Sequence, residues 1–198
     1  MPPAGTSPID PTRFSATFTE TLPKVSRSKW AAMAQADRHL IIDGYNVIHA
    51  VDDFRPLLPR SLDLACTQLV ERVRIIHDIE GIAVTTVFDG KGTSIDIQKP
   101  GGQPGFSVVY APVDATADGI IEQLVRNAPN PREVTIASRD NLIAEGARSS
   151  GGVCIWPEDL MGWVARCEGR MARLIAQKRQ QSRRVGGNDD PWRALDAL

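Results

Sequence analysis

Five short apolar runs recur through the middle of the chain, and each ends in polar or turn-forming residues. They are rich in β-branched and aromatic residues and nearly continuous in apolar character, which is typical of strands covered on both faces of a parallel sheet. The runs span residues 39–43, 83–89, 106–110, 133–138 and 153–156. The pattern therefore predicts a buried, mostly parallel sheet.

Apolar residues at helical spacing separate most of these runs. The longest series fills residues 61–80, a second follows Thr116, which is a candidate N-cap, and a third follows Asp140. A last helix is predicted from Pro157 to about Arg183, because proline favours the first helical turn. Strands that alternate with helices predict an α/β fold, a three-layer sandwich in which helices flank a central, mostly parallel sheet.

The chain divides into three parts by composition. Residues 1–38 contain scattered Pro, Ser and Thr, and we expect a flexible or loosely packed extension with a helical piece at 28–38. Residues 39–165 carry the alternating pattern and are expected to form the folded domain. Residues 166–198 are expected to form a basic helical extension and tail, in which the hydrophobic piece 191–195 is a candidate for docking back on the domain.

Charge is distributed unevenly along the chain. The 198 residues carry a net charge of −1, which by itself gives no sign of a polyanionic partner. Residues 39–165, however, are acidic, whereas residues 166–184 contain seven Arg or Lys and a single acid, Glu168. An acidic domain followed by a basic extension is an uneven charge distribution that suggests a functional role.

The three cysteines indicate a reducing environment. Cys66, Cys154 and Cys167 are too widely spaced for a metal finger, and free, buried thiols are expected, at least for the first two. The first 17 residues lack the apolar segment of a secretory signal, and no apolar run approaches the length of a membrane span. We therefore expect a cytoplasmic protein.

Four carboxylates fall at matching positions in this pattern. Asp43, Asp89 and Asp140 each end a predicted strand, and Asp118 lies in the first turn of the helix that follows Thr116. In a parallel sheet all four reach the carboxyl edge, where α/β proteins place their chemistry. Clustered carboxylates repel one another unless cations neutralise them, and oxygen ligands favour Mg²⁺ or Mn²⁺. The pattern therefore predicts a site for one or two such ions.

Each acid also has a purely structural interpretation. Asp89 precedes Gly90 in an ordinary turn signal, Asp140 can cap the next helix, and Asp118 can favour a helix dipole. Asn46 can be a turn residue, or it can orient a ligand beside Asp43. The coincidence of four acids favours the metal-site interpretation.

Several segments together resemble the NYN family of PIN-like nucleases, most closely its YacP-type branch. The segments are Ile41–Ile48 (IIDGYNVI), Val87–Gly90 (VFDG), Val108–Pro112 (VVYAP) with Thr116–Asp118 (TAD), and Ala137–Asp140 (ASRD). They occur in the family's order, and the resemblance covers about residues 39–165. It implies a PIN-like fold and a metal-dependent endoribonuclease. YacP-type relatives include a ribosome-dependent nuclease that acts on messenger RNA, so RNA and the ribosome are the partners that the resemblance suggests.

The resemblance also implies roles for particular residues. Asp43 and Asp140 would be central ligands of Mg²⁺ or Mn²⁺, Asp89 and Asp118 would complete the cluster, and Asn46 would lie beside them as a further catalytic residue. The chain departs from the family pattern in two places. Gly119 stands where many relatives have a second acid, and Arg139 separates Ser138 from its acid.

A nuclease with an acidic centre needs positive charge elsewhere to hold the phosphate backbone. The candidate RNA-binding residues are Lys91, in a glycine-rich loop at 90–105, and Arg139, Arg170 and Arg173. Solvated helix faces and a mobile hairpin are equally good interpretations of the loop and the basic run. Tyr45 is as well suited to packing as to stacking on a base, and His49 is predicted to be structural because it follows the apolar Val47 and Ile48.

Three hypotheses follow from the sequence. The first is an endoribonuclease that uses metal-activated water and leaves 5′-phosphate and 3′-hydroxyl ends. The second is a catalytically weak or inactive RNA- or ribosome-binding module of the same fold, which the departures at Gly119 and Arg139 favour. The third, a small-molecule phosphohydrolase, is disfavoured because the first strand lacks an Asp-x-Asp arrangement.

Overall fold

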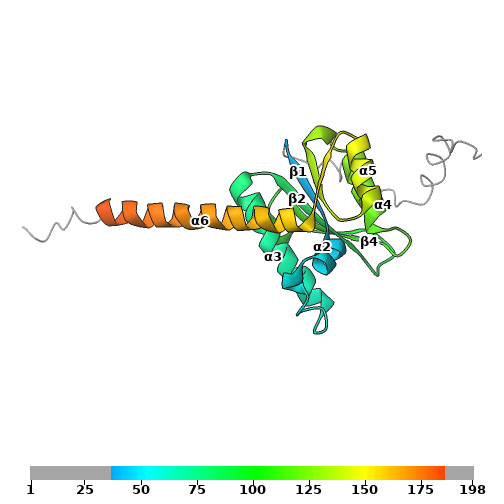
Figure 1. Ribbon diagram of the computed structural model, residues 1–198, viewed down its shortest axis with the longest axis horizontal. Helices are drawn as coiled ribbons and strands as arrows, with labels where there is room; N and C mark the ends of the chain where they lie inside the picture. The colour runs from blue at the N-terminus through cyan, green and yellow to red at the C-terminus, as the bar shows by residue number, and fades with distance from the viewer. Residues whose placement is uncertain (1–36, 186–198) are drawn as a thin grey trace, which may run out of the picture.

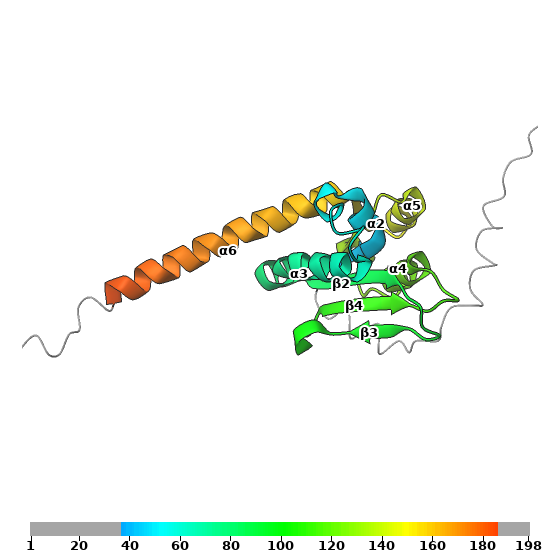
Figure 2. The ribbon, with the colours of Figure 1, turned by 90° about the horizontal axis from the view of Figure 1, so that it is seen from below.

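The computed structural model describes residues 37–185 and contains one six-stranded sheet (Figures 1 and 2). The strands lie in the order β3-β4-β2-β1-β5-β6, and all neighbours are parallel except β3, which runs antiparallel to β4. Their bounds are β1 (His39–Asp43), β2 (Ala83–Asp89), β3 (Asp96–Gln98), β4 (Phe106–Ala111), β5 (Val134–Ala137) and β6 (Val153–Ile155). The predicted, mostly parallel central sheet is confirmed.

Helices cover both faces of the sheet and make the fold a three-layer α/β sandwich. They are α2 (Gly44–Ala50), α3 (Leu62–Glu80), α4 (Ala117–Arg126), α5 (Asn141–Ser149) and α6 (Pro157–Val185). Short 3₁₀ turns add η2 (Asp52–Phe54), η3 (Pro100–Gly102) and η4 (Pro131–Glu133). Helices α2, α3 and α6 pack on one face, and α4 and α5 pack on the other.

The central strand shows why the sequence pattern was continuous rather than alternating. Every residue of β1 is buried, because successive side chains point to opposite faces and both faces are covered. Leu40 and Ile42 join the core beneath α3 and α6, whereas Ile41 joins the core beneath α4 and α5. The strand at the centre of the sheet is thus fixed by two hydrophobic cores.

The predicted helix boundaries agree with the caps in the structure. The hydroxyls of Ser61 and Thr116 accept hydrogen bonds from backbone N–H groups in the first turns of α3 and α4. Helix α3 ends at Gly81, whose φ of 67° lies in the left-handed region that glycine adopts most easily. Helix α6 begins at Pro157, as the proline rule predicts.

Two elements of the structure were not predicted from the sequence. Helix α2 begins directly after Asp43, where the sequence indicated a strand-to-loop turn. The glycine-rich loop at 90–105 contains the edge strand β3, whose three residues are too few for a recognisable period. Both elements are short, and tertiary packing rather than local pattern holds them in place.

Helix α6 runs without a break from Pro157 to Val185, as predicted, and so continues from the folded domain into the basic helical extension expected from residue 166. Its first half carries Leu160, Val164 and Cys167 into the core against α3, and its second half projects away from the body (Figure 1). The helical piece expected at 28–38 lies almost wholly outside the described residues, and the piece at 191–195 lies entirely outside them. Within residues 37–185, no helix is long and apolar enough to cross a membrane.

A prediction concerns the close contact between α2 and β2. A methyl group added at Gly44 would overlap the ring of the fully buried Phe88, whereas one added at Gly169 of α6 meets nothing within 4 Å. Gly44→Ala should lower the free energy of unfolding by about 1–3 kcal/mol through overpacking. The control Gly169→Ala should raise it by about 0.5–1 kcal/mol through helix propensity. Urea unfolding monitored by circular dichroism measures both, and equal stability of the two variants would contradict the account.

Candidate active site

A pocket of about 460 Å³ lies at the carboxyl edge of the sheet, where β1, β2 and β5 end. It collects all four carboxylates that the sequence singled out, together with Asn46 and Arg139. The lining residues are Asp43, Tyr45, Asn46, His49, Ala50, Asp89, Ala117, Asp118, Arg139 and Asp140. Residues separated by almost a hundred positions thus meet because parallel strands end at the same edge.

Asp43 is the most buried acid of the pocket, with only 7% of its surface exposed. Its Oδ1 accepts a hydrogen bond from the backbone N–H of Asn46 at 3.2 Å, which caps α2, and its Oδ2 accepts one from the Ser138 hydroxyl at 3.1 Å. Burial, with a smaller effect from the nearby carboxylates of Asp118 and Asp89, nevertheless raises the pKa of Asp43 to about 6, although these two bonds act to lower it. Asp43 therefore carries its charge in an unfavourable environment.

Asp89 and Asp118 line the pocket from the end of β2 and the start of α4. Asp89, at the end of β2, accepts a hydrogen bond from the Ala117 N–H at 2.8 Å and so fixes the first turn of α4. That turn presents Asp118 to the pocket. The pKa of Asp118 is raised, first by burial and then by the charges of Asp140, Asp89 and Glu122. The carboxylates of the pocket thus interact electrostatically with one another.

Asp140 has a structural role as well as a place in the pocket. Its Oδ1 accepts hydrogen bonds from the N–H groups of Leu142 and Ile143, so it caps α5. The Ser138 hydroxyl accepts a hydrogen bond from the Asp140 N–H at 3.0 Å while donating to Asp43. Ser138 therefore joins the ends of β1 and β5.

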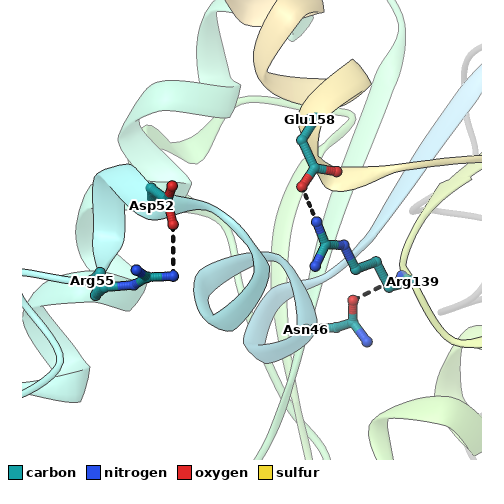
Figure 3. Close-up of polar contacts among 5 residues, drawn as sticks. All are labelled: Asn46, Asp52, Arg55, Arg139 and Glu158. Atoms are coloured by element: carbon teal, nitrogen blue, oxygen red, sulfur yellow. Dashed lines mark hydrogen bonds and ion pairs between the residues drawn. The ribbon is translucent and has the colours of Figure 1, made fainter.

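A hydrogen bond joins Asn46 and Arg139, which both line the pocket (Figure 3). The Asn46 side-chain oxygen accepts a hydrogen bond from the Arg139 backbone N–H at 2.8 Å. The Arg139 guanidinium extends away from Asn46 to an ion pair with Glu158 in the first turn of α6. Arg139 thus adds a cation to the rim of an otherwise acidic pocket.

The arrangement of the carboxylates limits how a metal ion can bind. Among the side chains of the described residues, no three of His, Cys, Asp or Glu lie close enough together to hold an ion by themselves. One oxygen each of Asp89 and Asp140 is used in capping, and the other oxygens are available. This donor set fits Mg²⁺ or Mn²⁺ held by one or two carboxylates, water and a substrate phosphate, which is the usual mode for Mg²⁺. It does not provide a closed protein cage.

The other predicted RNA-binding residues lie away from the pocket. Lys91 is exposed just after β2 but is not part of the lining. Arg170 forms an ion pair with Glu80 of α3, and Arg173 is exposed farther along α6. Of the four predicted basic contacts, the structure thus brings only Arg139 to the carboxylates.

His49 was missed as a pocket residue. It is exposed and lines the pocket, although its apolar neighbours suggested a structural role. Because α2 starts at Gly44, Val47 and Ile48 face the core, and residues 45, 46, 49 and 50 share the face toward the pocket. Tyr45 packs on Phe88, with ring centroids 5.2 Å apart, and also reaches the pocket. Helical spacing from Asn46 to His49 was the signal that could have revealed this face.

The cysteines take no part in the pocket. All three are free; Cys66 and Cys167 are buried, and Cys154 is partly buried. The prediction of free thiols is confirmed, and burial raises the pKa of each thiol. They are therefore poor candidates for nucleophiles.

Comparisons with known proteins identify the same fold. Two crystal structures of Rae1 (YacP) from Bacillus subtilis are similar to this chain. A tryptophan-to-leucine mutant has 23% identity and a TM-score of 0.58, covering 70% of this chain and 81% of that chain. The second structure has 24% identity and a TM-score of 0.55, and the match covers 79% of this chain and 95% of that chain. At this level of identity the likeness shows the shared fold. A search of curated proteins found no match.

The family itself is established by a match along most of the chain. The YacP-like NYN domain matches residues 40–193, which include every strand and helix of the described structure except the first residue of β1. This match confirms the resemblance that the motifs indicated, and it supports a nuclease-like function directed at RNA. The chain belongs to the family of YacP-like NYN domains.

Proposed function

We propose that this protein is an endoribonuclease that depends on Mg²⁺ or Mn²⁺. The observation that carries the proposal is the pocket of four carboxylates at the carboxyl edge of the sheet. Burial and mutual repulsion raise the pKa values of Asp43 and Asp118, so holding these charges together is electrostatically costly. A divalent cation offsets that cost and at the same time attracts a phosphate.

Of the four carboxylates, Asp43 and Asp118 would hold the cation, together with water and a substrate phosphate. Asp89 and Asp140 line the same pocket, each with one oxygen in a bond to a backbone N–H group. Hydrogen bonds from Asn46 and Ser138 fix the orientation of Asp43 before any ligand binds. When bound, the cation supplies an acidified water for attack on a phosphodiester and neutralises charge on the phosphate. We expect products with 5′-phosphate and 3′-hydroxyl ends.

Other pocket residues are suited to holding the RNA. Arg139 places a guanidinium on the rim, where it can exchange its exposed partner Glu158 for a phosphate oxygen. His49 and Tyr45 offer a donor and an aromatic ring along the α2 wall. A messenger RNA bound to the ribosome is one candidate substrate, because the family resemblance suggests it. The cytoplasm, where such RNA is found, is the proposed location.

A non-catalytic RNA-binding module is the second candidate. It is favoured by the absence of three clustered metal-binding side chains among residues 37–185 and by the use of Asp140 as a helix cap. Under this alternative, RNA binding persists in EDTA and no cleavage occurs at any concentration of Mg²⁺ or Mn²⁺.

The first prediction concerns cation binding without RNA. Saturating Mn²⁺ should raise the thermal midpoint of the wild-type protein, because an ion that binds only the folded state at 100 times its Kd stabilises it by about 2.7 kcal/mol. Asp43→Asn and Asp118→Asn should lose most of this shift. The matched control Asp159→Asn removes an exposed acid outside the pocket and should keep it. A wild-type midpoint that Mn²⁺ leaves unchanged would contradict the proposed site.

The second prediction concerns pH in the presence of EDTA. The pKa of Asp43 is 3.8 when unfolded and about 6 when folded, so the unfolded chain loses its proton first. Asp43 should therefore reduce stability progressively as pH rises from about 4 to 6, by an amount on the order of 1–3 kcal/mol. Asp43→Asn keeps an oxygen that can cap α2 and should make the decline smaller, leaving the part due to the raised pKa of Asp118. Urea unfolding across pH 4 to 8 measures the free energy of unfolding of the wild type and of Asp43→Asn. The same pH dependence in both proteins would show that the pKa of Asp43 does not change on folding, and would contradict the prediction.

The third prediction concerns cleavage. Purified wild-type protein should cut single-stranded or ribosome-bound RNA in Mg²⁺ or Mn²⁺ and should stop when EDTA is added. Asp43→Asn should reduce the rate at least about a hundredfold, because Asp43 is the best-oriented acid. Asp159→Asn should cleave at the wild-type rate. Undiminished cleavage by Asp43→Asn would refute the catalytic role.

A further inference from the structure

A large aromatic side chain stands in solvent beside the active site. Trp156 follows β6 directly and is 57% exposed, although tryptophan is usually well buried. Pro157 comes next and starts α6, which favours an extended backbone at Trp156. The core on either face of the sheet does not account for this side chain, because Trp156 belongs to neither hydrophobic cluster.

The register of the sheet places Trp156 in line with the pocket. Ile42 pairs with Ala137, and Ala137 pairs with Ile155. One residue farther along these three strands, Asp43, Ser138 and Trp156 form a row across the carboxyl edge of the sheet. Hydrogen bonds support this row, because the Ser138 N–H donates to the Ile155 carbonyl at 3.2 Å and the Ser138 hydroxyl donates to Asp43. With strands about 4.8 Å apart, the Trp156 backbone lies about 10 Å from that of Asp43.

Arg139 connects the pocket with Trp156. It lines the pocket, its N–H is held by Asn46, and its guanidinium pairs with Glu158, two residues after Trp156. Figure 3 shows this guanidinium reaching from the edge of the sheet to the start of α6. The guanidinium therefore lies at the start of α6, paired with a residue two positions after Trp156. The Arg139–Glu158 pair is exposed, so a phosphate can replace Glu158 at little cost.

We propose that Trp156 and Arg139 form a subsite for single-stranded RNA next to the cleaved phosphate. A base stacks on the indole ring of Trp156, and a neighbouring backbone phosphate binds the Arg139 guanidinium. Aromatic rings hold unpaired bases in this way with little dependence on sequence. The inference rests on the proposed function for its choice of RNA as ligand, but it requires only binding.

The surroundings of Trp156 favour a nucleotide over an apolar protein partner. The side chains near it in the chain, Glu158 and Asp159, are charged and exposed, as is Arg139. The apolar surface is therefore interrupted by charge, whereas apolar protein interfaces need contiguous patches of a few hundred Å² or more. One exposed ring, with a guanidinium that pairs two residues along the chain, suits a nucleotide, which has one base and one phosphate.

The test measures RNA binding in EDTA, where the proposed cleavage is off. A fluorescein-labelled single-stranded oligouridylate is titrated with the full-length protein, and Kd is obtained from fluorescence anisotropy. Trp156→Ala should weaken binding about 5- to 100-fold, the range expected for loss of one stacked base. Trp156→Phe should retain most of the affinity, because it keeps an aromatic face. Circular dichroism melting checks that each variant is folded.

A matched control lies on the same strand. Val153 is also apolar and 52% exposed on β6, but it lies three residues back from the carboxyl edge. Val153→Ala should therefore bind RNA as the wild type does. An oligonucleotide of the same length with abasic riboses should bind the wild type weakly, and Trp156→Ala should cause little further loss with it.

The outcomes separate this inference from the proposed function. Wild-type affinity of Trp156→Ala, equal losses in Trp156→Phe and Trp156→Ala, or an equal loss in Val153→Ala would each overturn the subsite. Failure of the wild type to bind RNA would overturn it as well. If binding behaves as expected while no cleavage occurs in Mg²⁺ or Mn²⁺, the subsite stands and the endoribonuclease proposal fails.

Discussion

The buried carboxylate of Asp43 is the constraint on which the rest of the structure depends. One oxygen caps α2 and the other receives the Ser138 hydroxyl, so a single side chain ties the central strand to its own helix and to β5. Burial and two neighbouring acids nevertheless raise its pKa to about 6. A chain selected for stability alone would avoid this arrangement, because an apolar or amide side chain in that place avoids the desolvation cost.

The architecture is arranged so that this unfavourable charge is well oriented. Hydrophobic cores on both faces fix β1, and the parallel register brings the ends of β1, β2 and β5 together. Capping bonds from Asp89 and Asp140 then place the first turns of α4 and α5 around the same pocket. The hydrophobic cores and helix caps thus stabilise the fold enough to keep together a group of acids that repel one another.

The sequence was sufficient to predict most of the fold and the position of the acids. Continuous apolar runs predicted the five parallel strands, and the recurrence of Asp at their ends predicted the pocket at one edge, because both follow from the geometry of parallel sheets. Helix α2, β3 and the pocket face of His49 were not predicted. A seven-residue helix and a three-residue strand carry too little periodicity, and the orientation of His49 depends on where α2 begins.

The basic residues were harder to place than the acids, since long exposed side chains leave little trace in a hydrophobic pattern. Arg139 reaches the pocket because it directly follows Ser138 at the end of β5, whereas Arg170 pairs with Glu80 on the distant surface of α3. Trp156 illustrates the same limit. The sequence pattern predicted it as the last residue of a buried strand, whereas β6 ends at Ile155 and the Trp156 side chain is exposed.

The central claim is that the pocket around Asp43 binds a divalent cation, and anomalous X-ray diffraction from crystals soaked in Mn²⁺ tests it most directly. The account predicts at least one anomalous peak in the pocket, within about 2.0–2.3 Å of an oxygen of Asp43 or Asp118, with water completing the coordination. An empty pocket at saturating Mn²⁺, or a peak only at another place on the surface, would contradict it.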